Sequence, residues 1–152
     1  MRRISAQSVL VSSAVAERVG LSSSDLECLD LIVTAASGAL TPGELAAATG
    51  LTSGAITGVV DRLEKAGFVR READVADRRK VRLVANESRV RQMGVYYQRL
   101  AERMQALWAR MTEDQLQLVL DFARRSSDLT AEELAHIRTL PALKPGKVPR
   151  ST

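Results

Sequence analysis

Aromatic residues are scarce in this chain. Phe, Trp and Tyr together make up 3% of its 152 residues, too few for the stacking platforms that bind single-stranded nucleic acids. The single cysteine cannot close an internal disulfide, which suits a reducing compartment. One cysteine and one histidine also offer no cluster of metal ligands. These shortages argue against a single-strand or RNA binder, a disulfide scaffold and a metal site.

Long hydrophobic runs are also missing. No segment approaches the ~20 consecutive apolar residues of a membrane span. The chain opens on two arginines and an apolar stretch, as a signal peptide does, but Ser and Gln residues between positions 5 and 13 interrupt that stretch. We therefore expect a mature cytoplasmic protein with an amphipathic helix over residues 4–20, whose apolar residues include Val9, Val11, Val15 and Val19.

The residue patterns of common catalytic sites do not occur either. The sequence contains no glycine-rich phosphate loop, no histidine near a serine or cysteine nucleophile motif, and no carboxylate pair outside solvated helix faces. His136 stands alone on a predicted helix, where a histidine is usually a surface or packing residue. We therefore expect neither an enzyme nor a bound cofactor.

The composition that is present indicates one soluble domain with a local excess of positive charge. The chain is 45% hydrophobic and 26% charged, and its length suffices to bury a proper core. Its net charge is +4 and its pI is about 9.7. Between positions 62 and 82, eight bases stand against four acids, so this stretch alone carries an excess of +4. Localised basicity is expected where a protein binds phosphate groups.

Two short helices joined by a tight turn are predicted just before this basic stretch. Thr41 caps the first helix, and Pro42 occupies its first turn. Gly50 ends that helix, since glycine tolerates a left-handed C-cap. Thr52 or Ser53 then caps the second helix.

The second helix, which extends to about Ala66, has one apolar stripe and one face of small and polar residues. The stripe residues recur at three- and four-residue intervals and are Ile56, Val59, Val60 and Leu63. The other faces carry Ser53, Gly54, Ala55, Thr57, Gly58, Asp61, Arg62 and Lys65. A helix with a small, partly basic face can enter the major groove and reach base edges. The alternative, from these residues alone, is an ordinary helical hairpin with a solvated face.

A basic β-hairpin is predicted after Gly67. One strand covers residues 68–71 and its partner residues 80–84, where apolar side chains alternate. The turn between them is polar and ends in Asp77, Arg78 and Arg79, of which Asp77 is expected to hold an arginine in place. Paired arginines at a hairpin tip suit a narrow minor groove, where the negative potential is strongest. The alternative is a solvated turn.

The run LTSGAITGVVDRLEKAGFVRR followed by ADRRKVRL resembles the MarR family of bacterial winged-helix transcription regulators. The resemblance is strong from about Leu21 to Leu83 and rests on helix pattern alone in the flanks. It implies a mainly α fold with a small β wing, and a homodimer that binds a pseudo-palindromic operator in duplex DNA. Family members often lose DNA affinity on binding a small phenolic or lipophilic ligand, or on cysteine oxidation. We expect this chain to act as a repressor.

The pattern and the resemblance together predict which residues contact DNA. Bases would be read by Ser53, Ala55, Thr57, Gly58 and Arg62. Thr52 and Lys65 would lie near phosphates, and Arg78 and Arg79 would reach the minor groove. The alternative function is that of a winged-helix module that binds a protein partner, or of a chromosome-associated protein that binds DNA without sequence preference.

The helix before this lobe is predicted from the same local signals. Ser22, Ser23 or Ser24 caps this helix, Ser24 and Glu27 have the spacing of a capping box, and Gly38 ends the helix. Its predicted buried stripe consists of Leu26, Leu29, Ile32, Val33 and Ala36. Cys28 lies beside the stripe, where a small packing residue is favoured over a redox switch because no base lies one turn away.

The longest helix is expected after the wing, beginning at Asn86 or Ser88. It carries a heptad stripe of Val90, Met93, Tyr97, Leu100, Met104, Leu107 and Met111. Such a helix predicts a strut between the DNA-binding lobe and a dimer interface. Tyr96 and Trp108 lie beside the stripe, either as packing residues or as the lining of a ligand pocket.

Two further helices are predicted towards the C-terminus. Thr112 caps the first, which ends near Ser126, and Thr130 with Glu133 opens a short last helix to Leu140. We therefore expect a single domain over residues 1–140, with a DNA-binding lobe at about 38–86, dimerisation helices at about 4–20 and 88–140, and a disordered basic tail at 141–152.

Overall fold

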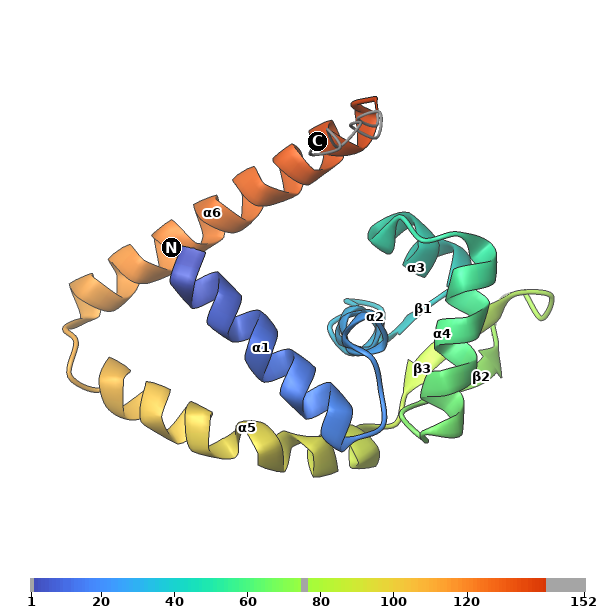
Figure 1. The fold of residues 1–152 in the computed structure, drawn as a ribbon, viewed down its shortest axis with the longest axis horizontal. Helices are drawn as coiled ribbons and strands as arrows, with labels where there is room; N and C mark the ends of the chain where they lie inside the picture. The colour runs from blue at the N-terminus through green and yellow to red at the C-terminus, as the bar shows by residue number, and fades with distance from the viewer. Residues whose placement is uncertain (1, 75–76, 142–152) are drawn as a thin grey trace, which may run out of the picture. The chain divides into compact units, whose positions relative to one another are not determined.

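Helices make up most of the chain and one small sheet accompanies them, as predicted (Figure 1). The computed structural model describes residues 2–74 and 77–141. The elements in chain order are α1 (Arg2–Arg18), α2 (Ser23–Val33), β1 (Ala39–Leu40), α3 (Pro42–Thr49), α4 (Ser53–Lys65), β2 (Val69–Ala73), β3 (Val81–Ala85), α5 (Glu87–Trp108) and α6 (Glu113–Thr139). The chain forms two compact units, residues 1–101 and 102–152, and α5 begins in the first and ends in the second.

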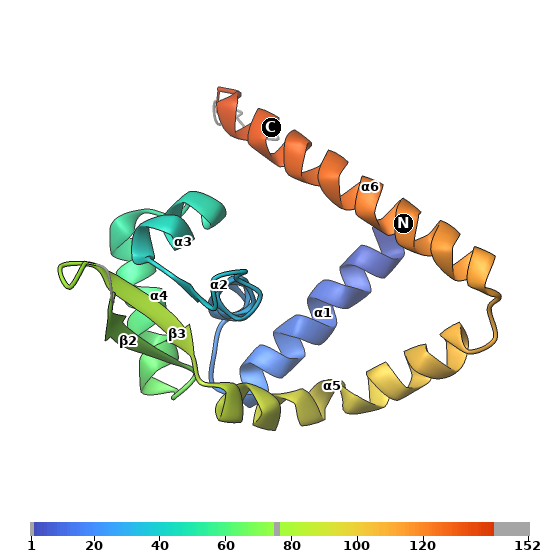
Figure 2. The same ribbon diagram turned by 180° about the vertical axis from the view of Figure 1, so that it is seen from behind.

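The sheet is antiparallel, with β3 between β1 and β2. The predicted hairpin is confirmed, since β2 pairs with β3 from Val69 opposite Ala85 to Ala73 opposite Val81. The two-residue strand β1 was not predicted, because so short a segment has no period of its own. It pairs with β3 through Leu40 and Leu83. Figure 2 shows the hairpin extending past α4 on the side away from α1.

The core of the first unit lies where α2, α3 and α4 meet the sheet. All four predicted stripe residues of α4 are buried, and Leu45 of α3 lies beneath them. The largest side chains in this core are Phe68, Leu29, Ile32, Leu45, Ile56, Leu63 and Leu83, each less than 2% exposed. Burying aliphatic and aromatic side chains of this size contributes about 1.5–3 kcal/mol each. This core holds α4 with its opposite face in solvent.

The predicted caps around the helical turn are confirmed. Thr41 and Glu44 form a reciprocal capping box, with the Glu44 backbone N–H 3.2 Å from the Thr41 hydroxyl. Gly50 ends α3 with a φ of 74°, the left-handed conformation that glycine adopts without a Cβ penalty. Thr52 is the N-cap of α4, and its hydroxyl accepts a hydrogen bond from the Ala55 backbone N–H at 3.3 Å.

The start of α2 agrees with the prediction, but its capping box and its C-terminal end do not. Ser22, one of the three predicted caps, caps the helix and pairs with Asp25, so the predicted box of Ser24 and Glu27 does not form. The register shifts because Asp25 is 1% exposed and faces the protein, whereas Glu27 is exposed. The helix ends at Val33, and Val33 and residue 36 are exposed rather than buried.

Cys28 lies on the buried side of α2, in the hydrophobic core, as the packing interpretation predicted. Its side chain is 1% exposed. Burial, followed by the negative charges of Asp25 and Glu27, raises the pKa of its thiol above the usual value. A buried thiol that resists ionisation is a poor nucleophile.

The C-terminal helices differ from prediction in their lengths. α5 follows Asn86, whose side chain accepts from the Arg89 backbone N–H, but α6 is the longer helix, with 27 residues against 22. Thr112 caps α6 as predicted. The helix then continues through Ser126, and Thr130 lies inside it, where its hydroxyl donates to the Ser126 carbonyl at 2.7 Å instead of capping a new helix.

Several remaining expectations concern the ends of the chain. α1 is amphipathic, with Val15 and Ala16 buried and Val9 and Val11 exposed. His136 lies exposed on α6. The predicted tail falls, apart from Pro141, outside the described residues. Within those residues, no helix has the length and apolar character to cross a membrane.

Candidate nucleic-acid interface

The exposed face of α4 is made of small and charged residues. Opposite the buried stripe, Gly54, Gly58, Asp61 and Lys65 recur at intervals of three and four residues, so they lie in one row along the helix. The predicted base-contacting residues Ser53, Ala55, Thr57 and Arg62 are exposed on either side of this row. Gly54 and Asp61 belong to the row but were not among the predicted contacts, although helical spacing alone places them there.

Two glycines leave this face open. A Cβ built on Gly54 would meet no heavy atom within 4 Å. One built on Gly58 would lie 3.3 Å from Nη1 of Arg62, a contact that a shift of a few tenths of an ångström relieves. Neither glycine has a positive φ, so the backbone does not require glycine at these positions. The absence of side chains therefore allows another molecule to approach the helix backbone closely.

The two threonines of this surface make hydrogen bonds within α4. Thr52 accepts from the Ala55 N–H as N-cap, which leaves its hydroxyl proton free to donate outwards. Thr57 donates to the Ser53 carbonyl at 2.9 Å, so its hydroxyl oxygen keeps acceptor capacity. Both side chains are exposed at the N-terminal half of the helix.

Arg62 is held by an acid from another helix. Its Nε lies 3.1 Å from both carboxylate oxygens of Asp25, and its Nη2 lies 2.7 Å from Oδ1. The Asp25 side chain is 1% exposed and that of Arg62 is 54% exposed. Burial opposes ionisation of Asp25, but hydrogen bonds from Arg62 and Ser22 hold the pKa of its carboxyl below the ordinary value. The pair is therefore charged, and one edge of the guanidinium is fixed.

The wing is tied to the body of the first unit by Arg82. Its guanidinium donates to the Ala39 carbonyl at 2.8 Å and to the Ser37 hydroxyl at 3.0 Å, and it lies 3.2 Å from the Asp74 carboxylate. These contacts connect β3, the segment before β1 and the end of β2. Sequence reasoning treated Arg82 only as part of the basic stretch, and its role follows from contacts that are distant in the chain.

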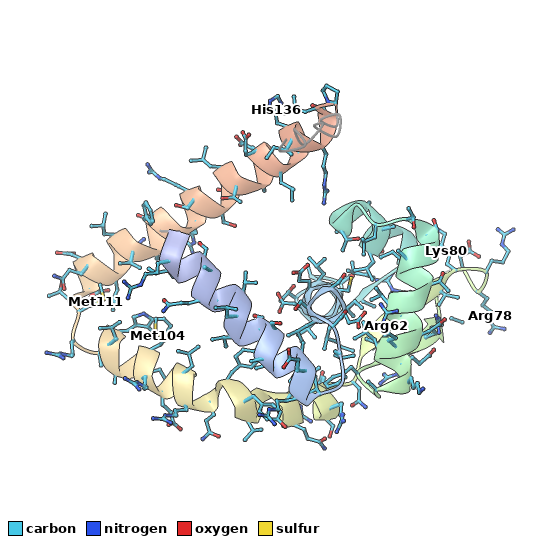
Figure 3. The ribbon with its side chains drawn as sticks, viewed as in Figure 1. Arg62, Arg78, Lys80, Met104, Met111 and His136 are labelled. Carbon is cyan, nitrogen blue, oxygen red and sulfur yellow. The ribbon has the colours of Figure 1, made fainter. Side chains whose placement is uncertain are left out.

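At the tip of the wing, Asp77 organises the turn. Its carboxylate accepts from the Arg79 backbone N–H at 3.1 Å and from Arg79 Nε at 3.3 Å, as predicted for an acid that holds an arginine. The Arg79 side chain is nonetheless 92% exposed. Arg78 extends from the end of the hairpin, away from the helices (Figure 3). Both predicted minor-groove arginines are thus accessible.

The sequence of this helical turn and wing is similar to known transcriptional regulators. The MarR family model matches residues 21–81. An uncharacterised HTH-type transcriptional regulator of Bacillus subtilis (strain 168), YcgE, is 36% identical over 137 residues, which cover 90% of this chain and 88% of that protein. The chain belongs to the MarR family of transcriptional regulators.

Solved MarR-family structures share the fold. A mutant of MepR from a multidrug-resistant S. aureus clinical isolate superposes with a TM-score of 0.70 at 19% identity, covering 84% of this chain and 93% of that one. A second S. aureus MepR mutant, solved bound to an oligodeoxyribonucleotide, matches with a TM-score of 0.57 at 20% identity, covering 84% and 94%. At these identities the likeness concerns the fold alone.

Ion pairing divides the basic stretch of this MarR-family chain into two groups. Arg62, Arg70, Arg71, Arg79 and Arg82 each pair with an acid. Arg71 is shared between Asp61 and Glu64, so the acid at the centre of the α4 face is partly neutralised. Among the described residues of the stretch 62–82, the bases with no acidic partner are Lys65, Arg78 and Lys80. The unneutralised charge therefore lies at the end of α4 and on the wing.

A cavity of about 450 Å³ lies between α1, α2 and α5 in the first unit. Its apolar lining includes Val9, Leu26, Val90, Met93 and Tyr97, and its acids are Glu27 and Asp30. Among the described residues, no basic side chain lines it. Tyr96 and Trp108, which were predicted either to pack or to line a ligand pocket, are about half exposed and do not line this cavity.

Proposed function

We propose that this regulator binds duplex DNA sequence-specifically as a homodimer and represses transcription in the cytoplasm. The observation that carries the proposal is the open face of α4, where Gly54 and Gly58 have no side chains and the flanking residues are small or polar. Base edges in the major groove are reached only by a helix that can approach without steric obstruction.

The position of the free bases supports the same proposal. Lys65 lies at the C-terminal end of α4, and Arg78 and Lys80 lie on the wing. Phosphates beside the major groove would meet Lys65, and the adjoining minor groove would meet Arg78 and Arg79. The MepR structure with bound oligodeoxyribonucleotide shows that this fold can bind DNA in a relative.

The exposed apolar residues of α6 support a homodimer. Leu118 is 70% exposed and Leu129 is 65% exposed, and no residue of α6 is buried. A long helix gains most of its stability by burying an apolar face, so a helix with this composition requires a partner. A second copy of the chain would cover α6 and would present two recognition helices to two half-sites.

The cavity beside α2 supports release of DNA by a small ligand. Its volume falls within the range of small-molecule sites, and its lining combines apolar side chains with a few polar groups. We propose a small lipophilic or phenolic molecule as its ligand. Because α2 also contacts α4 through Asp25 and Arg62, a change at the cavity can reach the recognition helix.

Selection of the purified protein against a random duplex library at near-physiological salt tests the proposal. An enriched inverted repeat, with half-sites about one helical turn apart, is the expected result. The affinity for that repeat should exceed the affinity for a scrambled duplex by ~10³-fold or more. Tight binding at low salt without any enriched sequence would instead indicate a nonspecific DNA-binding protein.

A further inference from the structure

The contact between Asp25 and Arg62 links two helices that are far apart in the sequence. Asp25 lies in the first turn of α2 and Arg62 in the last turn of α4, 37 residues later. We propose that Asp25 is a positioning residue for DNA recognition: it holds Arg62 so that the free edge of the guanidinium reads a base. This inference rests on the proposed function and names the residue that sets the specificity of the same surface.

The hydrogen bonds leave one edge of Arg62 available. A guanidinium has five N–H donors in a planar fork. Asp25 occupies the edge formed by Nε and Nη2, while Nη1 makes no hydrogen bond to the described residues. The edge formed by Nη1 and the second N–H of Nη2 can therefore donate to one acceptor pair. Guanine O6 and N7 are the pair that arginine commonly recognises in the major groove.

Burial makes the orientation of Arg62 rigid. The Asp25 carboxylate is 1% exposed and is also held by the Ser22 backbone N–H at 2.9 Å, so it cannot follow a moving arginine. If Arg62 turned away, the carboxylate would remain buried without its charged partner, which is costly. A free surface arginine would instead lose rotamer freedom on binding DNA.

The surroundings of Arg62 leave room for a base. Nη1 lies beside Gly58, where a Cβ would be 3.3 Å away, and the arginine side chain is 54% exposed. Gly58 is in the row of residues opposite the core, so the open edge of Arg62 borders the face that would meet the groove. Paired acids elsewhere differ from Asp25, since Glu72 and Glu87 are 46% and 85% exposed and can move with their arginines.

The test is base preference measured at every position of the selected half-site. Wild type, Asp25→Asn, Arg62→Ala and the double variant are compared on duplexes with single base-pair changes. We expect wild type to prefer guanine at one position by roughly tenfold or more. Asp25→Asn and Arg62→Ala should flatten the preference at that same position and leave the others, and the double variant should match Arg62→Ala.

Nonspecific affinity separates positioning from loss of structure. Asp25→Asn removes a negative charge, so its affinity for a scrambled duplex should be equal to or higher than that of wild type. A partly unfolded variant would lose affinity for all duplexes alike. Glu87→Gln is the matched control, because it removes an acid from an exposed arginine pair within α5 and should keep the wild-type profile.

Arg62→Lys provides a second variant that does not depend on Asp25→Asn folding. Lysine keeps the charge near Asp25 but has no planar fork. We expect it to lose the base preference while keeping the salt dependence of binding. Retention of the preference by Arg62→Lys or Asp25→Asn would overturn the inference and leave the proposed function intact. If wild type itself selected no sequence, the proposed function would fail instead.

Discussion

Replacing Gly58 by alanine should stabilise the protein and weaken its binding to DNA. Gly58 lies inside α4 with a helical backbone, so alanine gains about 1 kcal/mol of helix propensity. The new Cβ would meet Nη1 of Arg62 at 3.3 Å, so the free edge of the guanidinium has to move by a few tenths of an ångström while its other edge stays paired with Asp25. Thermal unfolding should show this gain as a rise of about 2–4 °C in Tm.

The same methyl group would occupy the face of α4 that we assign to the major groove. An added methyl group in a closely packed contact costs about 1–3 kcal/mol, which corresponds to roughly 5- to 150-fold in affinity. Fluorescence anisotropy with the selected duplex measures this loss. Affinity for a scrambled duplex should change little, because phosphate contacts do not require the closest approach of the helix.

Gly94→Ala is the matched control for this substitution. Gly94 lies inside α5, and a Cβ there would meet no heavy atom within 4 Å. We expect a similar gain in Tm with unchanged affinity for DNA. A stabilised Gly58→Ala protein that bound its duplex as tightly as wild type would refute the assignment of this face to DNA. A destabilised one would show that Arg62, held by Asp25, cannot make the small shift that the new methyl group requires.

Four other predictions follow from single residues. Arg78→Ala should lower affinity for the selected duplex by about 1–3 kcal/mol, whereas Arg91→Ala, on an exposed pair of α5, should bind as wild type; equal affinities would disprove the wing contact. Arg82→Gln removes three hydrogen bonds that hold the wing, and should reduce the free energy of unfolding by about 1–3 kcal/mol, measured by urea denaturation. Because the folded-state pKa of Asp25 is lowered, its stabilising effect is complete above about pH 4 and is lost as the pH falls through the folded-state value. Wild type should therefore lose stability more steeply than Asp25→Asn below about pH 4, and parallel curves would contradict the ion pair. Cys28, buried and with a raised pKa, should react with iodoacetamide only after unfolding, and rapid labelling of the native protein by mass spectrometry would argue against its burial.

Elements whose signals lie within a few residues were predictable from the sequence. The Thr41 cap, the left-handed Gly50 and the stripe of α4 depend on neighbours along the chain, and each forms in the structure. The same local signals were ambiguous at Ser22 and at Thr130. Ser22, Ser23 or Ser24 could cap α2, and Thr130 could cap a helix or lie within one. Only packing and helix continuation select between these choices.

The helical turn, the basic hairpin and the membership of the MarR family were thus already determined by the sequence itself. Which arginines are free was decided only by the tertiary structure. Arg62 meets Asp25 across 37 residues, and Arg82 meets Ser37 across 45. An ion pair forms when packing brings two side chains within about 4 Å, a distance that periodicity and composition do not encode. The eight bases of residues 62–82 therefore look alike in the sequence, while in the fold some of them hold the helix and the wing in place and others have no acidic partner among the described residues.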